Sequence, residues 1–236
     1  MENIIKNKIK DFERCEWFEY LAFKRAFIAG GALTSALTNR KINDFDIYFR
    51  TEKECQEAID HLTALDNFRC VARTENAVTF KRELSFSNSG EVIQLIRATH
   101  LINECIYDTI SSFDFTINMA AYDLSSGNVI AHKDFYKDNM KRKLVFNEDT
   151  KYPIVSMHRA IKYMGRGYKL SGYEQVKIAL AINNLKMEDY RDLKVQLQGI
   201  DTSIFQSITD KLMANPDNEY DYETFKSKME ETSKGE

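Results

Sequence analysis

Two patterns of apolar residues run along this chain, and each predicts its own kind of element. Short apolar or alternating runs between turn residues predict strands over residues 26–29, 43–48, 68–72, 77–81, 91–96, 115–122, 129–131 and 144–146. Apolar residues spaced three to four apart predict helices over residues 3–21, 33–37, 51–65, 153–164, 173–185, 187–198, 203–214 and 222–231. The order of these elements is typical of the α+β class.

The predicted elements divide the chain of 236 residues into two parts. Residues 1–150 mix strands and helices, which predicts a head domain with a small mixed sheet, whereas residues 151–236 are helical. The boundary is expected near residues 148–152, ahead of Pro153, because proline suits the first turn of a helix. The next helix has an apolar stripe made of Ile154, Met157, Ile161 and Met164.

The first predicted strand runs into two glycines, Gly30 and Gly31, and a short helix is predicted directly after them. Glycine accepts backbone angles that are closed to other residues and lets the chain approach a ligand closely. The N-terminus of a helix presents free backbone N–H groups and a partial positive charge. This stretch therefore predicts a binding site for an anion.

The next strand carries two acids, Asp44 and Asp46. Side chains two apart on a strand point to the same face, so both carboxylates are aimed at one spot, while Phe45 and Ile47 face the other way. Two carboxylates beside an anion site are what a pair of Mg²⁺ ions bridging a triphosphate requires. The alternative is an ordinary strand–helix turn followed by a surface strand with two solvated acids.

The order Gly-Gly, short helix and Asp-x-Asp resembles the polymerase-beta-like nucleotidyltransferases. The segment Asp-Phe-Thr-Ile-Asn at residues 114–118 is similar to one in tRNA CCA-adding enzymes and bacterial poly(A) polymerases, and residues 121–123 continue the match. The resemblance covers roughly residues 27–168 and implies a nucleotidyltransferase head followed by a helical neck. It also implies an enzyme that uses two Mg²⁺ ions to move a nucleoside monophosphate from an NTP to a hydroxyl, releasing pyrophosphate.

The resemblance assigns roles to single residues. The catalytic residues that it implies are Asp44, Asp46 and Asp114, of which Asp44 and Asp46 hold the metal ions. The nucleotide-binding residues that it implies are Gly30, Gly31, Thr34, Ser35, Arg159 and Lys162. For Arg159 and Lys162, the alternative is an ordinary solvated face of the neck helix.

The chain departs from the family pattern where a third acid is expected. Members of the superfamily commonly carry that acid on a strand beside the Asp-x-Asp strand, and here the polar residue inside the apolar strand is Gln94. A neutral amide can coordinate through its oxygen but cannot serve as a general base at neutral pH. Glu91 and Asp114 are the other candidates for the third acid, and Gln94 can also be a simple hydrogen-bonding residue of the sheet.

Two further departures concern nucleotide recognition. Ser112 and Phe113 stand where the related enzymes have two arginines ahead of the Asp-Phe-Thr-Ile-Asn segment. Residues 151–155 contain no acid and no arginine, although CCA-adding enzymes have a Glu-Asp-x-x-Arg template at the corresponding place. Programmed CCA addition is therefore not expected from these residues.

The charge distribution bears on the acceptor of the nucleotide. The formal net charge is −3, but residues 133–177 contain 11 Lys or Arg against 5 Asp or Glu, and residues 186–236 contain 7 against 12. A basic middle predicts a surface for a polyanion, or else a solvated cationic helix face. The candidate RNA-binding residues are Lys137, Lys141, Arg142, Lys143 and Arg166. The first candidate acceptor is the 3′ end of a tRNA-like RNA. The alternatives are a protein or small-molecule acceptor, or a head that binds nucleotide or RNA without turnover.

Composition excludes several other classes of protein. With 43% hydrophobic residues, no apolar run long enough to span a bilayer and no secretion signal, the chain is expected to be a cytoplasmic globular protein without a membrane partner. The 4 cysteines are scattered, with no Cys-x-x-Cys pair, which favours reduced thiols over a disulfide framework or a zinc finger. The sequence gives no indication of the oligomeric state.

Overall fold

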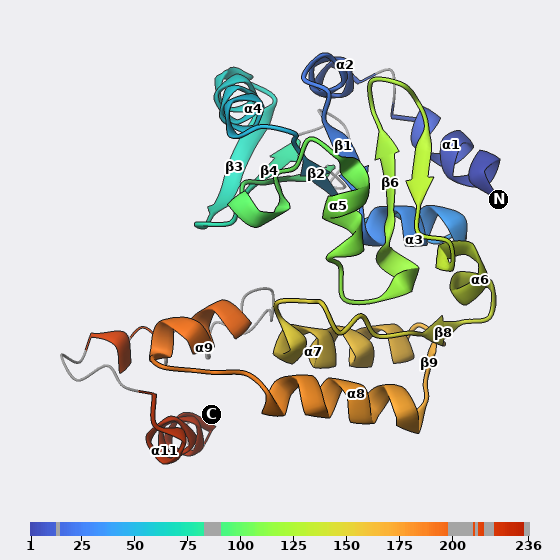
Figure 1. Ribbon diagram of the computed structural model, residues 1–236. Coiled ribbons are helices and arrows are strands. Elements are labelled where there is room, and N and C mark those ends of the chain that lie inside the picture. Colours follow the sequence, from blue (N-terminus) through green and yellow to red (C-terminus); the bar gives the residue numbers. More distant parts are fainter. Residues whose placement is uncertain (13–14, 83–90, 198–209, 211, 215–219, 234–236) are drawn as a thin grey trace. The chain divides into compact units, whose positions relative to one another are not determined.

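The computed structural model describes residues 1–12, 15–82, 91–197, 210, 212–214 and 220–233. The chain divides into two compact units, Met1–Asn147 and Glu148–Glu236, and each is described by itself (Figure 1). The turn predicted at residues 87–90 and most of the helix predicted over residues 203–214 lie outside the described residues.

The first unit is built on a seven-stranded sheet with the order β3-β4-β5-β2-β1-β6-β7. The strands are β1 Phe27–Ala29, β2 Asp44–Tyr48, β3 Phe68–Arg73, β4 Ala77–Arg82, β5 Val92–Ile96, β6 Ala120–Asp123 and β7 Val129–Ala131. Strands β2 and β5 run parallel, and the other neighbouring pairs are antiparallel. The predicted α+β class with a mixed sheet is therefore confirmed.

The two faces of this sheet differ in what covers them. On one face, here called the core face, Ile28, Phe45 and Ile47 join the main hydrophobic core. The helices that line this core are α1 Glu2–Lys10, α2 Glu16–Phe23, α3 Gly31–Leu37 and α4 Glu52–Ala64. The other face carries Asp44 and Asp46 and is called the acidic face. Its part over β1, β2 and β6 packs against α5 Ile106–Ser111 in a second, smaller cluster (Figure 1).

The predicted single helix over residues 3–21 is wrong, because the chain forms the two helices α1 and α2 there. Each helix buries its own apolar residues in the core, Ile5 and Ile9 in α1 and Trp17 in α2. Phe12 lies between them and packs edge-on against Phe45, with ring centroids 4.7 Å apart. Contacts with the sheet thus outweigh the local helical pattern.

The strand predicted over residues 115–122 is correct only in its second half. Its first half is a turn of 3₁₀ helix, η2 Thr116–Asn118, and β6 follows. The Thr116 hydroxyl donates a hydrogen bond to the buried Asp138 carboxylate at 2.7 Å, and this bond ties η2 to α6 Phe135–Met140. Buried polar side chains therefore set the local backbone here. The remaining short elements of the chain are η1 Thr99–Leu101, β8 Lys143–Leu144 and β9 Lys169–Leu170.

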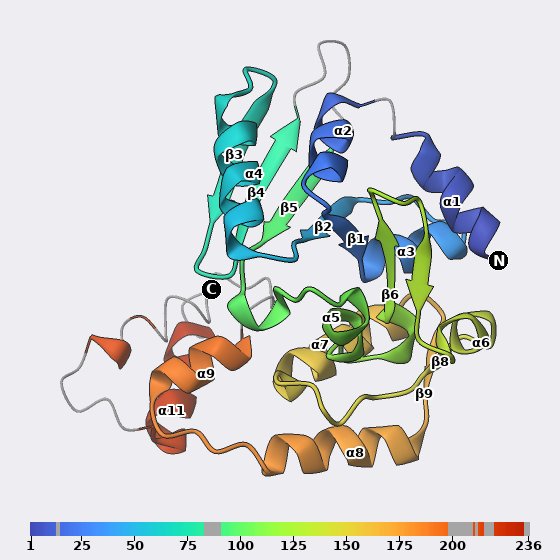
Figure 2. The ribbon, with the colours of Figure 1, turned by 45° about the horizontal axis from the view of Figure 1, so that its top comes forward.

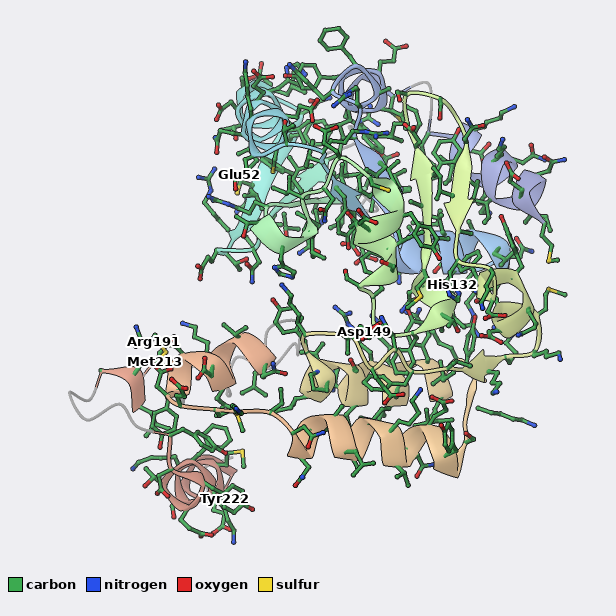
Figure 3. The ribbon with its side chains drawn as sticks, in the orientation of Figure 1. Glu52, His132, Asp149, Arg191, Met213 and Tyr222 are labelled. Carbon is green, nitrogen blue, oxygen red and sulfur yellow. The ribbon has the colours of Figure 1, made fainter. Side chains whose placement is uncertain are left out.

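The second unit is helical, as predicted. Its helices are α7 Pro153–Met164, α8 Gly172–Asn183, α9 Tyr190–Leu197 and α11 Tyr222–Ser233. Tyr190 and Leu193 of α9 form a small core with Leu212 and Phe225, and Met213 packs against it. Figure 3 labels Arg191 on α9 and Tyr222 at the start of α11. None of the described helices is long and apolar enough to cross a membrane.

The apolar stripe of α7 is mostly exposed. Met157, Ile161 and Met164 are 39%, 64% and 47% exposed. Helix α7 instead buries a different face, which includes Val155, Ser156, Ala160 and Tyr163. The buried face thus combines apolar residues with the polar Ser156, and the pattern of hydrophobicity alone does not show this.

Candidate functional site

Strand β2 carries both acids of the candidate site on the acidic face. Asp44 is exposed and Asp46 is half-buried, whereas Phe45 and Ile47 between and after them are buried in the core. The alternation follows from the pleat of the strand, which sends successive side chains to opposite faces. Both carboxylates therefore lie on one side of the sheet, where Asp44 is exposed to a ligand and the Oδ1 of Asp46 is buried.

The Gly-Gly turn lies at the same end of the sheet as these acids. Strand β1 runs antiparallel to β2, with Ile28 opposite Ile47, so the register continued by one residue brings Ala29 beside Asp46. Gly30 follows directly, with a φ of 76°, in the region that favours glycine. Gly31 then begins α3. The turn and the carboxylates are thus neighbours on adjacent strands.

Gln94 lies in the position next to Asp46 on the parallel neighbour β5. Thr79 of β4 lies opposite Gln94 on its other side, and the Gln94 amide nitrogen donates to the Thr79 hydroxyl oxygen at 3.3 Å. Thr79, Gln94 and Asp46 therefore form a row of polar side chains across three strands of the acidic face. The sequence did not lead us to predict Thr79 at the site. Its alternation with the buried Val78 and Phe80 could have indicated its place on the acidic face.

Glu91 does not belong to this row. Its carboxylate accepts hydrogen bonds from the Trp17 indole N–H at 3.0 Å and from Arg82 at 3.3 Å. Trp17 is part of the main core, so Glu91 is directed to the core face. The interpretation of Glu91 as a third acid of the site is wrong, because this carboxylate bridges α2 and β4 instead.

Asp114 is connected to the Gly-Gly turn through a buried hydrogen-bond network. Its side chain is buried, and its Oδ1 accepts from the Asn118 amide at 3.4 Å. The Thr34 hydroxyl of α3 donates to the Ile117 carbonyl and lies 3.3 Å from the Asn118 Oδ1. The network links Asp114, through Asn118, to Thr34 in the first turn of α3. It also directs the Thr34 hydroxyl inward, whereas Ser35 is half-exposed.

Phe113 occupies the place where the related enzymes carry an arginine. Its ring packs against Tyr48, with centroids 5.6 Å apart. It also lies over the turn, because a Cβ at Gly30 would come 3.7 Å from the Phe113 ring. The neighbouring Ser112 hydroxyl donates to the Thr109 carbonyl at 2.7 Å, at the end of α5. The wall of the site is therefore apolar at this point, and its contact with Gly30 could not be read from the sequence.

The predicted RNA-binding residues of the first unit are not equivalent. Lys137 on α6 is exposed and forms an ion pair with Asp134 at 2.6 Å. Lys141 and Lys143 are exposed at the end of α6 and in β8. Arg142 between them is half-buried and has a φ of 52°. A backbone in the left-handed region makes Arg142 part of the turn.

The other predicted cations lie in the second unit. Arg159 and Lys162 are exposed on α7, and Arg166 follows that helix. The Arg166 guanidinium lies 5.5 Å from the centre of the Tyr163 ring, within the range of a cation–π contact.

The donor set on β2 suits a hard divalent cation. Mg²⁺ prefers carboxylate and water oxygens and is usually held by one or two carboxylates together with substrate phosphates. Asp44 forms no ion pair with any other described residue. No group of three or more His, Cys, Asp or Glu side chains that could hold a metal is found within the described parts of the chain. The residues present thus fit a site of two carboxylates that relies on substrate for further ligands.

A family model matches this chain over residues 1–142, and its description is Gabija anti-defense 2 family protein. The chain belongs to the Gabija anti-defense 2 family. A curated relative, "Gabija anti-defense 2" from Bacillus phage SPbetaL7, is 36% identical over 197 residues, which cover 83% of this chain and 46% of the relative. This family member therefore spans about half the length of the curated relative that it matches. The sequence alone did not indicate this family.

Solved structures similar to this family member are nucleotidyltransferase-fold enzymes. A CCA-adding enzyme in complex with ATP has a TM-score of 0.56 at 16% identity, over 97% of this chain and 58% of that one. A tRNA-processing enzyme has a TM-score of 0.55 at 18% identity, over 87% of this chain and 56% of that one. These similarities confirm the predicted nucleotidyltransferase fold. At such identity they carry no information on CCA-adding specificity.

Proposed function

We propose that this chain is an Mg²⁺-dependent nucleotidyltransferase, which moves a nucleoside monophosphate from an NTP to an acceptor hydroxyl. The observation that carries the proposal is the position of Asp44 and Asp46 on one face of β2, beside the turn at Gly30 and Gly31. The shared fold of the similar enzymes supports it.

Each group at the site has a defined task in this reaction. Asp44 and Asp46 hold two Mg²⁺ ions, which when bound neutralise the phosphate charge and favour in-line attack. The backbone at Gly30 and Gly31, with the Ser35 hydroxyl, binds the β- and γ-phosphates. The acceptor oxygen forms a bond to the α-phosphorus, the bond from that phosphorus to the bridging oxygen breaks, and pyrophosphate leaves.

The proton of the acceptor hydroxyl needs a base. Gln94 cannot accept it at neutral pH, so on the acidic face the Asp44 and Asp46 carboxylates are the groups that can. Asp114 is buried and accepts a hydrogen bond from Asn118. Through this bond it stabilises α3 and the phosphate-binding backbone.

RNA is the first candidate acceptor, with a tRNA-like 3′ end as its specific form. The segment Asp-Phe-Thr-Ile-Asn, the exposed Lys141 and Lys143, and the similarity to a tRNA-processing enzyme support this choice. A protein or small-molecule acceptor is the second candidate. It is favoured by Phe113, whose ring fills the place of an arginine, and by the name of the family, which points to action against a defence called Gabija.

Labelled NTPs test the proposal directly. The protein is incubated with Mg²⁺ and each labelled NTP, together with total RNA, protein or small metabolites from bacterial cells, and incorporation into each fraction is measured. Label in the RNA fraction is expected. Asp44→Asn and Asp46→Asn should each abolish it with unchanged circular dichroism, and Asp66→Asn, at another exposed aspartate, should leave it intact. If none of the three fractions is labelled, the chain is not a nucleotidyltransferase, and the alternative of a head that binds nucleotide or RNA without turnover takes its place.

The family name adds a test in cells. We expect the wild-type chain to restore phage growth in cells that carry the Gabija defence, and Asp44→Asn to lose this ability at equal protein level. Asp66→Asn again serves as the control. If Asp44→Asn restored phage growth as fully as the wild type, the anti-defence role would not depend on nucleotidyl transfer.

A further inference from the structure

The edge of the sheet carries two cationic side chains on the same face as Asp44. Arg69 on β3 lies opposite Lys81 on β4, Lys81 lies opposite Val92 on β5, and Val92 lies opposite Asp44 on β2. Residues opposite one another on neighbouring strands share a face of the sheet. These four positions therefore form one row across the acidic face.

The row is short enough for one extended ligand to span. Neighbouring strands are about 4.8 Å apart, so the backbone of Lys81 lies about 10 Å and that of Arg69 about 14 Å from the backbone of Asp44. Figure 2 shows β3, β4 and β5 side by side, with β3 at the edge. The cations thus lie on a line that leads from the edge of the sheet to the carboxylates.

A β-bulge decides which arginine of β3 belongs to the row. The pairing with β4 shifts between Cys70 and Ala72, so Val71 is the extra residue. Without the bulge, Arg69 and Arg73 would share a face, since they are four residues apart. With it, Arg73 lies opposite Val78, which is buried in the core, and therefore points to the core face.

The row is open and carries positive charge only at its edge. Arg69 and Lys81 are exposed, and neither forms an ion pair with another residue that the structure describes. Strands β3 and β4 contain no acid. Apart from the bulged Val71, the other side chains of these strands on the acidic face are small, namely Ala72, Ala77 and Thr79. A linear polyanion could lie along this surface without displacing a large side chain.

We propose that Arg69 and Lys81 bind the phosphate backbone of an RNA acceptor whose 3′ end reaches Asp44 and Asp46. The inference rests on the proposed function and names its substrate class as a polynucleotide. An RNA strand carries a charge on each successive phosphate, so it can contact both cations and the site at once. A small-molecule acceptor held at the carboxylates would not extend to Arg69.

Binding of a labelled single-stranded RNA at several salt concentrations tests the row. The double variant Arg69→Ala/Lys81→Ala should bind on the order of tenfold more weakly at low salt, and its log–log salt slope should fall by about 1.4, or 0.7 for each lost contact. Arg73→Ala is the matched control, because it removes an exposed arginine from the same strand but from the opposite face. It should leave both quantities unchanged. Arg69→Lys/Lys81→Arg, which keeps both charges, should also bind RNA as the wild type does.

Three outcomes would overturn the row, and they differ from a failure of the proposed function. The first is wild-type affinity in the double variant, and the second is an equal loss in Arg73→Ala. The third is a wild-type protein that transfers nucleotide to protein or small molecules without binding RNA, which would leave the proposed function standing. Conversely, a protein that transfers no nucleotide but binds RNA through Arg69 and Lys81 would remove the proposed function and keep the RNA-binding row.

Discussion

At residue 94 the chain carries an amide side chain at the strand position next to Asp46, on the parallel neighbour of β2. A carboxylate at this point would share the face of Asp44 and Asp46, add a hard oxygen ligand and supply a group that can accept a proton. The Gln94 amide can coordinate a metal ion through its oxygen, but it carries no charge and cannot accept a proton at neutral pH. Residue 94 therefore controls both metal affinity and the protonation chemistry of the proposed site.

Gln94→Glu should raise the rate of nucleotidyl transfer by about tenfold or more, because general-base catalysis contributes at least that much. The Mg²⁺ concentration for half-maximal rate should fall as well. Single-turnover rates measured over a range of Mg²⁺ concentrations check both effects. Gln94→Leu, which keeps the size but has no oxygen, should be less active than the wild type. If Gln94→Glu transferred nucleotide more slowly than the wild type, the proposed effect of residue 94 on the reaction would be wrong.

At Asp114 the test is to remove a carboxylate, whereas at residue 94 it is to add one. Asp114 is buried, and its Oδ1 accepts a hydrogen bond from Asn118. Asp114→Asn keeps an oxygen that can accept this bond, so the free energy of unfolding should change by no more than about 1 kcal/mol. The rate of nucleotidyl transfer should nevertheless fall severely, because the negative charge of the Asp114 carboxylate is lost. Urea unfolding and transfer assays on the same protein separate the two effects. A variant with near-normal transfer would make Asp114 a purely structural residue.

At the scale of single elements, α4 is stabilised by a capping box. The Thr51 hydroxyl accepts from the Glu54 N–H at 3.2 Å, and the Glu54 carboxylate accepts from the Thr51 N–H at 3.2 Å. Thr51→Ala should lower the free energy of unfolding by about 1 kcal/mol, whereas Thr51→Ser should leave it nearly unchanged. Chemical denaturation of both variants checks this. Equal stability of the alanine and serine variants would show that the cap contributes nothing to the fold.

The elements that the sequence predicted well are those whose signals are local. The helix after Thr51 was predicted from its cap and its acidic first turn, and β2 from the alternation of its acids with Phe45 and Ile47. The break between α1 and α2 and the 3₁₀ turn at Thr116 were not, because packing against the sheet and a buried bond to Asp138 decide them.

The candidate site divides in the same way. Its acids and glycines could be read from spacing, because they lie on consecutive elements. The row of Arg69 and Lys81 could not, since it depends on strand order and on the bulge at Val71. A sequence contains the residues of such a row but not the register that aligns them.

For the whole molecule, a net charge of −3 coexists with separate cationic surfaces. One is the row of Arg69 and Lys81, and another is the end of α6 with the exposed Lys141 and Lys143. An acceptor that is a long polyanion should contact both kinds of surface, and each contact adds to the salt dependence of binding. A small acceptor should contact neither strongly. The salt dependence of the whole protein therefore reports the size of its acceptor.

Lys141→Ala/Lys143→Ala should weaken RNA binding and lower the log–log salt slope by about 1.4, as expected for two contacts to a single strand. Arg142 is left in place, because its half-buried side chain and left-handed backbone would confuse a loss of charge with a change in the turn. Lys226→Ala/Lys228→Ala, with the same spacing on the exposed surface of α11, is the control.

Fluorescence anisotropy at several salt concentrations gives the slopes, and thermal unfolding verifies that each variant is folded. If the Lys141/Lys143 and Lys226/Lys228 pairs lower the slope equally, RNA is attracted by overall charge and not by the end of α6. If neither pair changes a measurable slope, the polyanion runs over other surfaces, and the row of Arg69 and Lys81 should then account for most of it.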